Sequence, residues 1–217
     1  KPFVVSIALE TNRVRPDTVI GTKNFVVGGK SIRDAHVYEK LTVAEVIQKS
    51  SNIGTVKMAM TMEPREMYEM FSAVGLGQKP QIGFPGTVTG RLRPYKTWKP
   101  VEQATMSYGY GLSVTAVQLA HAYAALANGG GMTPLSMIRV DSKPGAMQVM
   151  SADVAKTLQG MLQQVVEAPR GVFRAQVPGY HVAGKSGTAR KTNAGAKGYQ
   201  TNSYRSLFAG FAPAQDP

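Results

Sequence analysis

The sequence contains no cysteine, which excludes disulfide bonds and thiolate metal sites from this chain. It has no apolar run of about eighteen residues and no secretory signal at its start, so none of it is expected to cross a membrane. Acidic residues are scarce, with 13 against 25 basic ones, which gives a formal net charge of +12. No zinc finger, RNA-binding aromatic pair or basic helix accompanies this charge, so nucleic acid is not an expected partner. An anionic envelope surface or a general surface bias is left to explain it.

The 217 residues are enough to bury one sizeable core, and no repeat or linker divides them, so we predict one domain over residues 1–217. Capping boxes at Thr42-x-x-Glu45 and Thr115-x-x-Gln118 predict two helix starts. Apolar stripes predict further helices at 53–60, 64–74 and 151–165, and glycine and proline predict a long loop at 76–99. Alternation predicts strands at 177–190 and 204–212, joined by a polar loop at 191–203. The pattern indicates an α+β fold: a helical block packed on an antiparallel sheet, incomplete at both ends.

Two short motifs carry chemistry. Ser50-Ser51-Asn52 stands at a predicted turn between helices, and Lys185-Ser186-Gly187-Thr188 stands on a predicted strand. Alone, the first is better explained as a helix end followed by an N-cap, and the second as a surface strand whose glycine relieves a bulge. Together, in this order, they are two of the three elements of a serine acyltransferase site.

The third element, Ser-x-x-Lys, is absent from the sequence, which begins Lys1-Pro2-Phe3. Proline is tolerated only in the first turn or so of a helix, so a helix through Phe3, Val4 and Ile7 should begin close to Lys1. A serine three positions before Lys1 would share its helix face. This beginning resembles the end of the Ser-x-x-Lys motif in division-type penicillin-binding proteins, where the motif runs directly into proline and a hydrophobic helix. The resemblance implies that the nucleophilic serine lies just upstream of Lys1, outside this chain.

With these motifs in place, the chain resembles the transpeptidase domain of a class B, division-type penicillin-binding protein of a Gram-negative bacterium, with most likeness to pseudomonad sequences. The fold implied is that of penicillin-binding proteins and serine β-lactamases. Ser51 and Ser186 stand where many relatives carry Asp and Thr. The other stretches that carry the resemblance are Gly83-Phe84-Pro85-Gly86, Ala104-Thr105-Met106-Ser107-Tyr108-Gly109-Tyr110-Gly111, Gln118-Leu119-Ala120, Pro134-Leu135-Ser136 and Phe208-Ala209-Gly210-Phe211-Ala212-Pro213.

The resemblance implies four catalytic residues. Lys1, desolvated beside the nucleophile, would be its general base. Ser50 would relay a proton to the departing amine, and Asn52 would hold the amide of the donor peptide. Lys185 would supply positive potential.

Seven residues are implied in substrate binding. The hydroxyls of Ser186 and Thr188 would bind the terminal carboxylate of D-Ala-D-Ala, and the Thr188 N–H would complete an oxyanion hole with that of the absent serine. Gly187 would allow an extended peptide to approach the strand. The remaining candidates, weighed against surface or core roles, are Arg190, Tyr108, Tyr110 and Tyr204.

No cofactor and no metal are implied. The implied partners are peptidoglycan stem peptides, β-lactams and divisome proteins, including a septal glycan polymerase. The resemblance also implies a periplasmic location and a membrane anchor elsewhere in the parent protein. Two alternatives stay open at this point: a β-lactamase or D,D-carboxypeptidase on the same fold, and a non-catalytic β-lactam-binding module.

Overall fold

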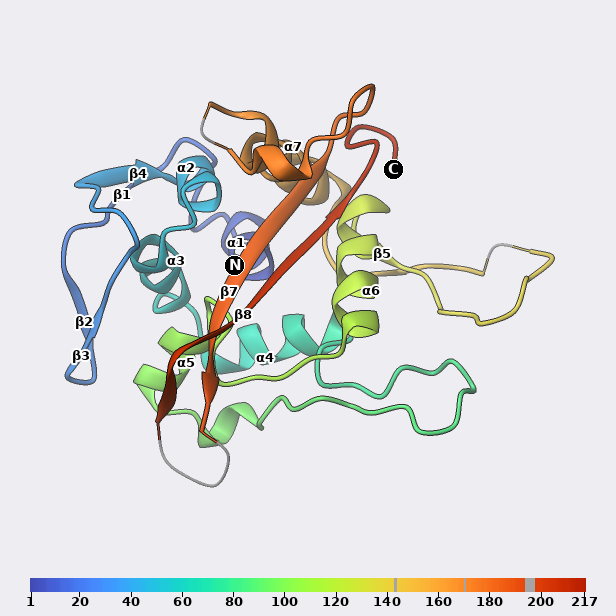
Figure 1. The fold of residues 1–217 in the computed structure, drawn as a ribbon, viewed down its shortest axis with the longest axis horizontal. Helices are drawn as coiled ribbons and strands as arrows, with labels where there is room; N and C mark the ends of the chain where they lie inside the picture. Colours follow the sequence, from blue (N-terminus) through green and yellow to red (C-terminus); the bar gives the residue numbers. More distant parts are fainter. Residues whose placement is uncertain (143, 170, 194–197) are drawn as a thin grey trace.

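The structure, a computed structural model, describes residues 1–142, 144–169, 171–193 and 198–217. It combines helices with short antiparallel sheets, which confirms the α+β prediction (Figure 1). The helices are α1 (Pro2–Glu10), α2 (Val43–Gln48), α3 (Asn52–Ala59), α4 (Pro64–Ala73), α5 (Pro100–Met106), α6 (Ala116–Ala127) and α7 (Ala152–Glu167). The strands are β1 (Val19–Gly21), β2 (Phe25–Val27), β3 (Lys30–Ile32), β4 (Lys40–Thr42), β5 (Gly131–Met132), β6 (Met147–Gln148), β7 (Ala183–Thr192) and β8 (Tyr199–Phe211).

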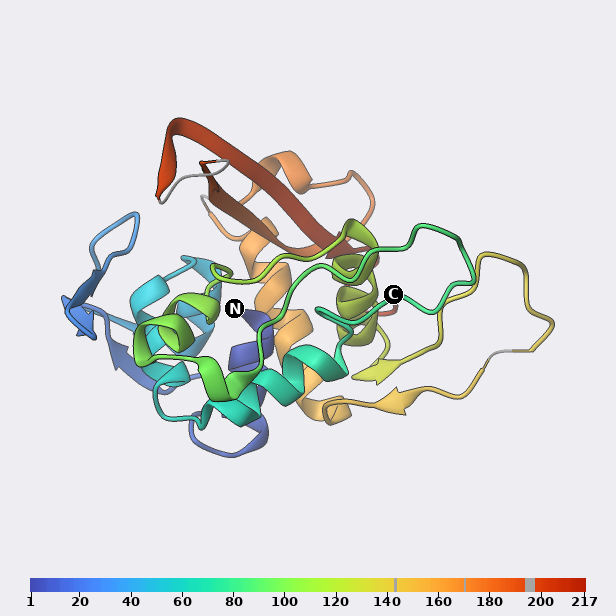
Figure 2. The ribbon, with the colours of Figure 1, turned by 90° about the horizontal axis from the view of Figure 1, so that it is seen from below.

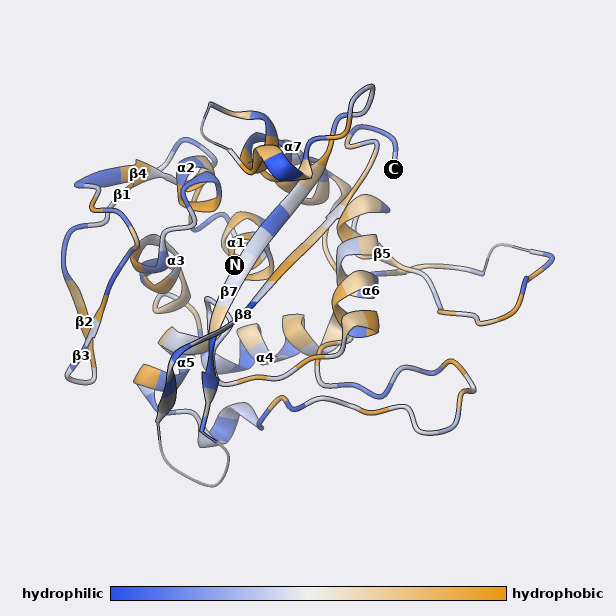
Figure 3. Cartoon of the chain, viewed as in Figure 1, coloured by the Kyte–Doolittle hydropathy of each residue, from blue (hydrophilic) through white to orange (hydrophobic). Residues whose placement is uncertain are grey.

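Helix α1 lies at the centre of the molecule. It is apolar on all sides, and Val4, Val5 and Ala8 are fully buried. A helix that is hydrophobic all round is stable only inside a core, and α1 packs against α3, α4 and α7. Figure 3 shows hydrophobic colour on both α1 and α6. The first residue of the chain, Lys1, is thereby fixed at the end of the most enclosed helix.

The predicted helix starts are confirmed. The hydroxyl of Thr42 accepts a hydrogen bond from the Glu45 N–H at 3.2 Å, and the Glu45 carboxylate accepts one from the Thr42 N–H at 2.8 Å. Thr115 and Gln118 form the same reciprocal pair at the start of α6. The Gln118 side chain also donates to the carbonyls of Gln78 and Thr89, and so ties the predicted 76–99 loop to α6. Figure 2 shows this loop and the β5–β6 loop projecting from the same side of the body.

Strands β7 and β8 form a long antiparallel hairpin over the helices. Strand β7 packs on α7 and β8 packs on α6. The register pairs Lys185 with Ala209, Gly187 with Leu207 and Arg190 with Tyr204. In the described part of the chain, β7 pairs with no strand other than β8, so its second edge is open.

The predicted bounds of this hairpin were wrong at both ends. Strand β7 begins at Ala183 instead of residue 177, because Pro178 and Gly179 form a tight turn that is closed by a single bridge between Val177 and Tyr180. Strand β8 begins at Tyr199 instead of residue 204, since pairing resumes beyond a register shift between Arg190 and Thr192. The predicted loop at 191–203 is correspondingly shorter, and its residues 194–197 lie outside the described residues.

Short elements in the first half of the chain were also missed. Strand β1 pairs with β4, and β2 pairs with β3 around Gly28 and Gly29, whose φ angles of 53° and 77° suit a two-residue hairpin turn. Strands of three residues are too short to show alternation in a sequence. Helix α5 was missed as well, although Lys99-Pro100-x-Glu102 begins it with a proline in the first turn and Glu102 accepting from the Lys99 N–H.

Gln103 provides a test of the core. Its buried side chain donates to the carbonyls of Ala59 at 3.0 Å and Met62 at 2.8 Å, which joins α5 to the end of α3. Gln103→Met keeps the volume but leaves both carbonyls without this partner, so we expect it to lower the free energy of unfolding by about 1–3 kcal/mol. The exposed Gln164 on α7 is a matched control, and Gln164→Met should change stability by less than about 0.5 kcal/mol in the same denaturation experiment.

Among the described residues, no helix has the length and apolar character required to cross a membrane.

Candidate active site

Ser50 occupies a position that usually belongs to glycine. It follows the last turn of α2 with a φ of 59°, in the left-handed region. Its N–H donates to the Ile47 carbonyl at 3.2 Å, and the next N–H, that of Ser51, donates to the Val46 carbonyl at 3.0 Å. This pair of bonds is the Schellman ending of a helix, which favours glycine because a side chain strains the backbone there. The local fold thus accepts a strained serine and places its hydroxyl beside Lys1.

The rest of this motif begins α3. Ser51 is the fully buried N-cap, whose hydroxyl accepts from the Gly54 N–H at 2.9 Å. The Asn52 side chain donates through Nδ2 to the Arg33 carbonyl at 2.9 Å, which fixes the amide so that Oδ1 faces Lys1. The interpretation of the motif as a helix end followed by an N-cap is therefore also correct, although the N-cap is Ser51.

Lys1 brings the first predicted residues together. Its Nζ lies 3.3 Å from the Ser50 Oγ and 2.8 Å from the Asn52 Oδ1. Burial, reinforced by the nearby Lys185 ammonium, lowers the pKa of the Lys1 side chain from 10.5 to about 7, and the Asp34 carboxylate opposes this shift. An amine with this pKa is substantially neutral at working pH, which a general base requires.

Lys185 faces the helical side of the hairpin. Only 7% of it is exposed, and its Nζ donates to the Ser186 carbonyl at 3.1 Å. Burial lowers its pKa to about 8. Lys185 is close enough to Lys1 for its charge to act on the pKa of that residue. The two motifs that are far apart in the sequence therefore share one electrostatic environment.

The open edge of β7 presents a restricted set of backbone groups. The Arg190 N–H donates to the Tyr110 hydroxyl at 3.1 Å, so the backbone of Arg190 faces away from β8. Alternate residues of an antiparallel strand face the same edge, and the register is regular from 183 to 190, so Ser186 and Thr188 face this edge too. The Ser186 carbonyl accepts from Lys185. In the described part of the chain, no side chain bonds the backbone of Thr188, which leaves its N–H and C=O open to a ligand.

The aromatic candidates form a row from Lys1 to the end of this edge. The Lys1 Nζ lies 5.8 Å from the centre of the Tyr108 ring, and the Tyr108 and Tyr110 rings meet edge to face with centres 5.7 Å apart. Tyr110 contacts the Arg190 backbone, and the Arg190 guanidinium lies 5.9 Å from the centre of the Tyr204 ring. All four predicted residues are thus connected to the site.

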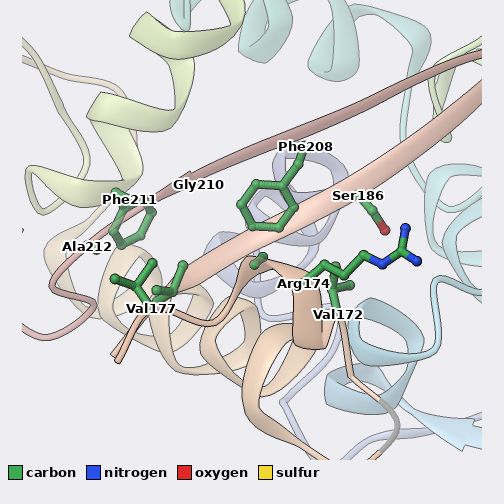
Figure 4. A pocket seen from close by; sticks show the side chains of 10 residues that line it. Val172, Arg174, Val177, Ser186, Phe208, Gly210, Phe211 and Ala212 are labelled. Carbon is green, nitrogen blue, oxygen red and sulfur yellow. The ribbon is translucent and has the colours of Figure 1, made fainter. Parts of the chain in front are cut away.

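The Ser186 side chain lies on the other face of the hairpin from Lys185. It is exposed and borders a pocket of about 490 Å³ between the hairpin and the segment after α7. Figure 4 shows that Phe208 and Phe211 from β8 face Val172, Val177 and Arg174 across this pocket. The described residues that line it do not include Lys1, Ser50 or Asn52. The expected role of Ser186 and Thr188 in binding a carboxylate therefore stays a prediction.

Sequence reasoning missed one residue of this site, Asp34. Its carboxylate accepts hydrogen bonds from the Ser51 hydroxyl and from the backbone of Asn52. No sequence motif marks it, since it stands in a segment between short strands that were themselves not predicted. Among the described residues, no group of three or more His, Cys, Asp and Glu side chains is arranged to hold a metal ion.

Comparison with known proteins identifies the class of protein to which this fold belongs. Residues 1–217 match the family described as penicillin binding protein transpeptidase domain, and the chain belongs to this family. The probable peptidoglycan D,D-transpeptidase PbpC of Pseudomonas aeruginosa is 42% identical over the whole chain, and the peptidoglycan D,D-transpeptidase FtsI of Escherichia coli K12 is 36% identical. The resemblance inferred from the motifs is thereby confirmed.

A solved structure gives the same result for the fold. The transpeptidase domain of penicillin-binding protein 3 from Burkholderia pseudomallei superposes with a TM-score of 0.94 at 49% identity. The present chain is covered completely in each comparison, but it spans 38% of the Pseudomonas protein, 37% of the Escherichia coli protein and 66% of the Burkholderia chain.

Proposed function

We propose that this chain is part of a peptidoglycan D,D-transpeptidase that cross-links stem peptides through a serine acyl-enzyme and is acylated by β-lactams. The observation that carries the proposal is the position of the Lys1 amine, which is held between Ser50 and Asn52 with a pKa near 7. The relatives of this chain that are named as peptidoglycan D,D-transpeptidases support the same reaction. The nucleophile would be a serine three positions before Lys1 in the parent gene.

In the acylation step, the oxygen of this serine attacks the carbonyl between the two D-Ala residues, and neutral Lys1 takes the proton of the serine hydroxyl. The new bond is an ester to the serine. The C–N bond breaks, and the proton passes by way of Ser50 to the departing amine of D-Ala. Asn52 holds the amide of the donor peptide. Lys185 favours the neutral form of Lys1 by charge repulsion and supplies positive potential for the developing anion.

The open edge of β7 supports the binding of an extended substrate. In this proposal the Thr188 N–H stabilises the oxyanion together with the N–H of the serine, and the Thr188 carbonyl accepts a hydrogen bond from an amide of the substrate. Gly187 fits this role, since a Cβ there would meet only the Leu207 side chain at an ordinary 3.4 Å. By contrast, Gly184 is required by the chain itself, because a Cβ there would collide with Phe208 and the Ala209 carbonyl.

In the second step, an amine of another stem peptide attacks the ester carbonyl, the new amide bond forms and the C–O bond to the serine breaks. Lys1 takes the proton of the amine and returns it to the serine oxygen. The hydroxyls of Ser186 and Thr188 bind the terminal carboxylate of the donor, and Tyr108, Tyr110, Arg190 and Tyr204 form one wall of the groove. We place the reaction in the periplasm, in a protein with a membrane anchor outside this chain, working with divisome proteins that include a septal glycan polymerase. Residues 1–217 would belong to one transpeptidase domain.

The test is mass spectrometry of the full-length protein after treatment with benzylpenicillin. We expect a mass increase equal to one penicillin, located on the peptide that precedes Lys1, and an adduct that persists for many minutes. The persistence is expected because the opened ring stays tethered in the site and blocks the approach of a second nucleophile.

Rapid release of penicilloate would contradict transpeptidation and indicate a hydrolase. An absence of both adduct and turnover would indicate a non-catalytic module. A control protein in which the serine before Lys1 is replaced by alanine should show neither adduct nor turnover.

A further inference from the structure

A short segment between β3 and β4 lies against the Ser50-Ser51-Asn52 turn. Arg33 and Asp34 follow β3 directly. The Arg33 carbonyl accepts from the Asn52 side chain, and Asp34 accepts three further hydrogen bonds, from Ser51, Asn52 and Ile53. Two catalytic candidates thus depend for their position on a segment that supplies no reacting group of its own.

The three bonds use both oxygens of the Asp34 carboxylate. Oδ2 accepts from the Ser51 hydroxyl at 2.5 Å, and Oδ1 accepts from the backbone N–H of Asn52 at 2.5 Å and of Ile53 at 2.9 Å. Hydrogen bonds to an ionised acceptor are shorter and stronger than neutral ones. The negative charge also lies at the N-terminus of α3, where backbone N–H groups favour it. A carboxylate is therefore better suited to this position than a neutral side chain.

We propose that Asp34 is a positioning residue of the transpeptidase reaction, which fixes Ser50 and Asn52 through the turn and holds a negative charge beside Lys1. The inference rests on the proposed function. Among the described residues, the hydrogen bonds of the Asp34 carboxylate go to Ser51, Asn52 and Ile53. Asp34 acts through the backbone of Asn52, whose side chain contacts Lys1, and through Ser51, the neighbour of Ser50.

The charges around Lys1 give Asp34 a measurable signature. The ionisable groups that act on the Lys1 ammonium are Lys185 from β7, which lowers its pKa, and Asp34, which raises it. Removal of the Asp34 charge therefore lowers the pKa of Lys1 further. Lys1 must be neutral to act as a base. The acidic limb of the pH–rate profile, in which the acylation rate rises with pH, should therefore move to lower pH. A residue that only supports the fold would not move this limb.

The experiment compares Asp34→Asn with Ser51→Ala in the full-length protein. Acylation by a chromogenic cephalosporin is followed from pH 5 to 9, and the pKa of Lys1 is measured independently by competitive labelling with acetic anhydride and peptide mass spectrometry. We expect Asp34→Asn to slow acylation by about 10-fold or more at the optimum pH. It should also shift the acidic limb of the pH–rate profile to lower pH and lower the Lys1 pKa. Ser51→Ala removes one of the three bonds and keeps the charge, so its acidic limb should stay in place.

The inference is overturned if Asp34→Asn acylates at the rate of the unmodified protein, or if its rate falls while the acidic limb and the Lys1 pKa do not move. It is also overturned if Ser51→Ala moves the limb as far as Asp34→Asn does. An unmodified protein that forms no adduct would refute the proposed function instead, and the labelling experiment distinguishes that result from a failure of the Asp34 inference.

Discussion

Lys1→Ala is expected to lower the rate of β-lactam acylation by about 10³-fold, the largest loss for any single residue of the chain. A positioned general base contributes about 10²–10⁴-fold to proton transfer, and the Lys1 amine is the one beside both Ser50 and Asn52. Its replacement also leaves the Asn52 Oδ1 without this donor. The rate is measured by stopped-flow with a chromogenic cephalosporin, with circular dichroism as a check that the protein is folded.

If Lys1 is the general base, the acylation rate should also depend on pH. Lys1 accepts a proton only when it is neutral, so the acylation rate should rise with pH through the Lys1 pKa of about 7 and level off above it. In Lys1→Ala this rise should be lost. Lys156→Ala on the exposed face of α7 is the matched control and should keep both the rate and the rise. An acylation rate that does not change between pH 5 and 8 in the unmodified protein would show that Lys1 is not the base.

Ser50→Gly is expected to give a protein that is more stable and much less active. The φ of 59° at Ser50 costs a non-glycine residue about 1 kcal/mol or more, and glycine adopts it without strain. The hydroxyl 3.3 Å from the Lys1 Nζ is lost at the same time, which should slow acylation by about 10²-fold if it relays the proton.

Ser50→Ala is the matched variant, because it removes the hydroxyl and keeps the strain. The two variants should acylate equally slowly, whereas the unfolding midpoint of Ser50→Gly should lie above that of Ser50→Ala. Thermal unfolding followed by circular dichroism, together with the same stopped-flow assay, separates the two effects. Equal midpoints would show that the left-handed backbone is not strained, and full activity in either variant would exclude the hydroxyl from the reaction.

The parts of the site that are encoded locally could be predicted from the sequence. Capping boxes at Thr42 and Thr115 involve residues three apart, so their pattern is visible in any window that contains them. The strand at Lys185 and the turn at Ser50 were predicted because each motif has a characteristic local conformation. Their meeting was inferred from the spacing and order of the two motifs, and in the structure the electrostatic influence of Lys185 on Lys1 agrees with it.

The parts that depend on contacts between distant segments could not be predicted. Asp34 lies 18 residues before Asn52, in a segment whose three-residue strands leave no periodic signal. The Tyr110 hydroxyl reaches the Arg190 backbone across 80 residues, and no rule of spacing indicates which of two nearby tyrosines does so. The ends of β7 and β8 were misplaced because proline and glycine near 178 and a register shift after Arg190 changed a regular pattern.

The central position of α1 also has an electrostatic consequence. The enclosure of α1 buries the Lys1 amine, and this burial is the largest cause of its lowered pKa. The Lys185 ammonium lowers the pKa in the same direction. Both causes lie inside the protein, where dissolved ions screen charges much less than they do at a surface. The pKa of Lys1 should therefore depend little on the ionic strength of the surrounding solution.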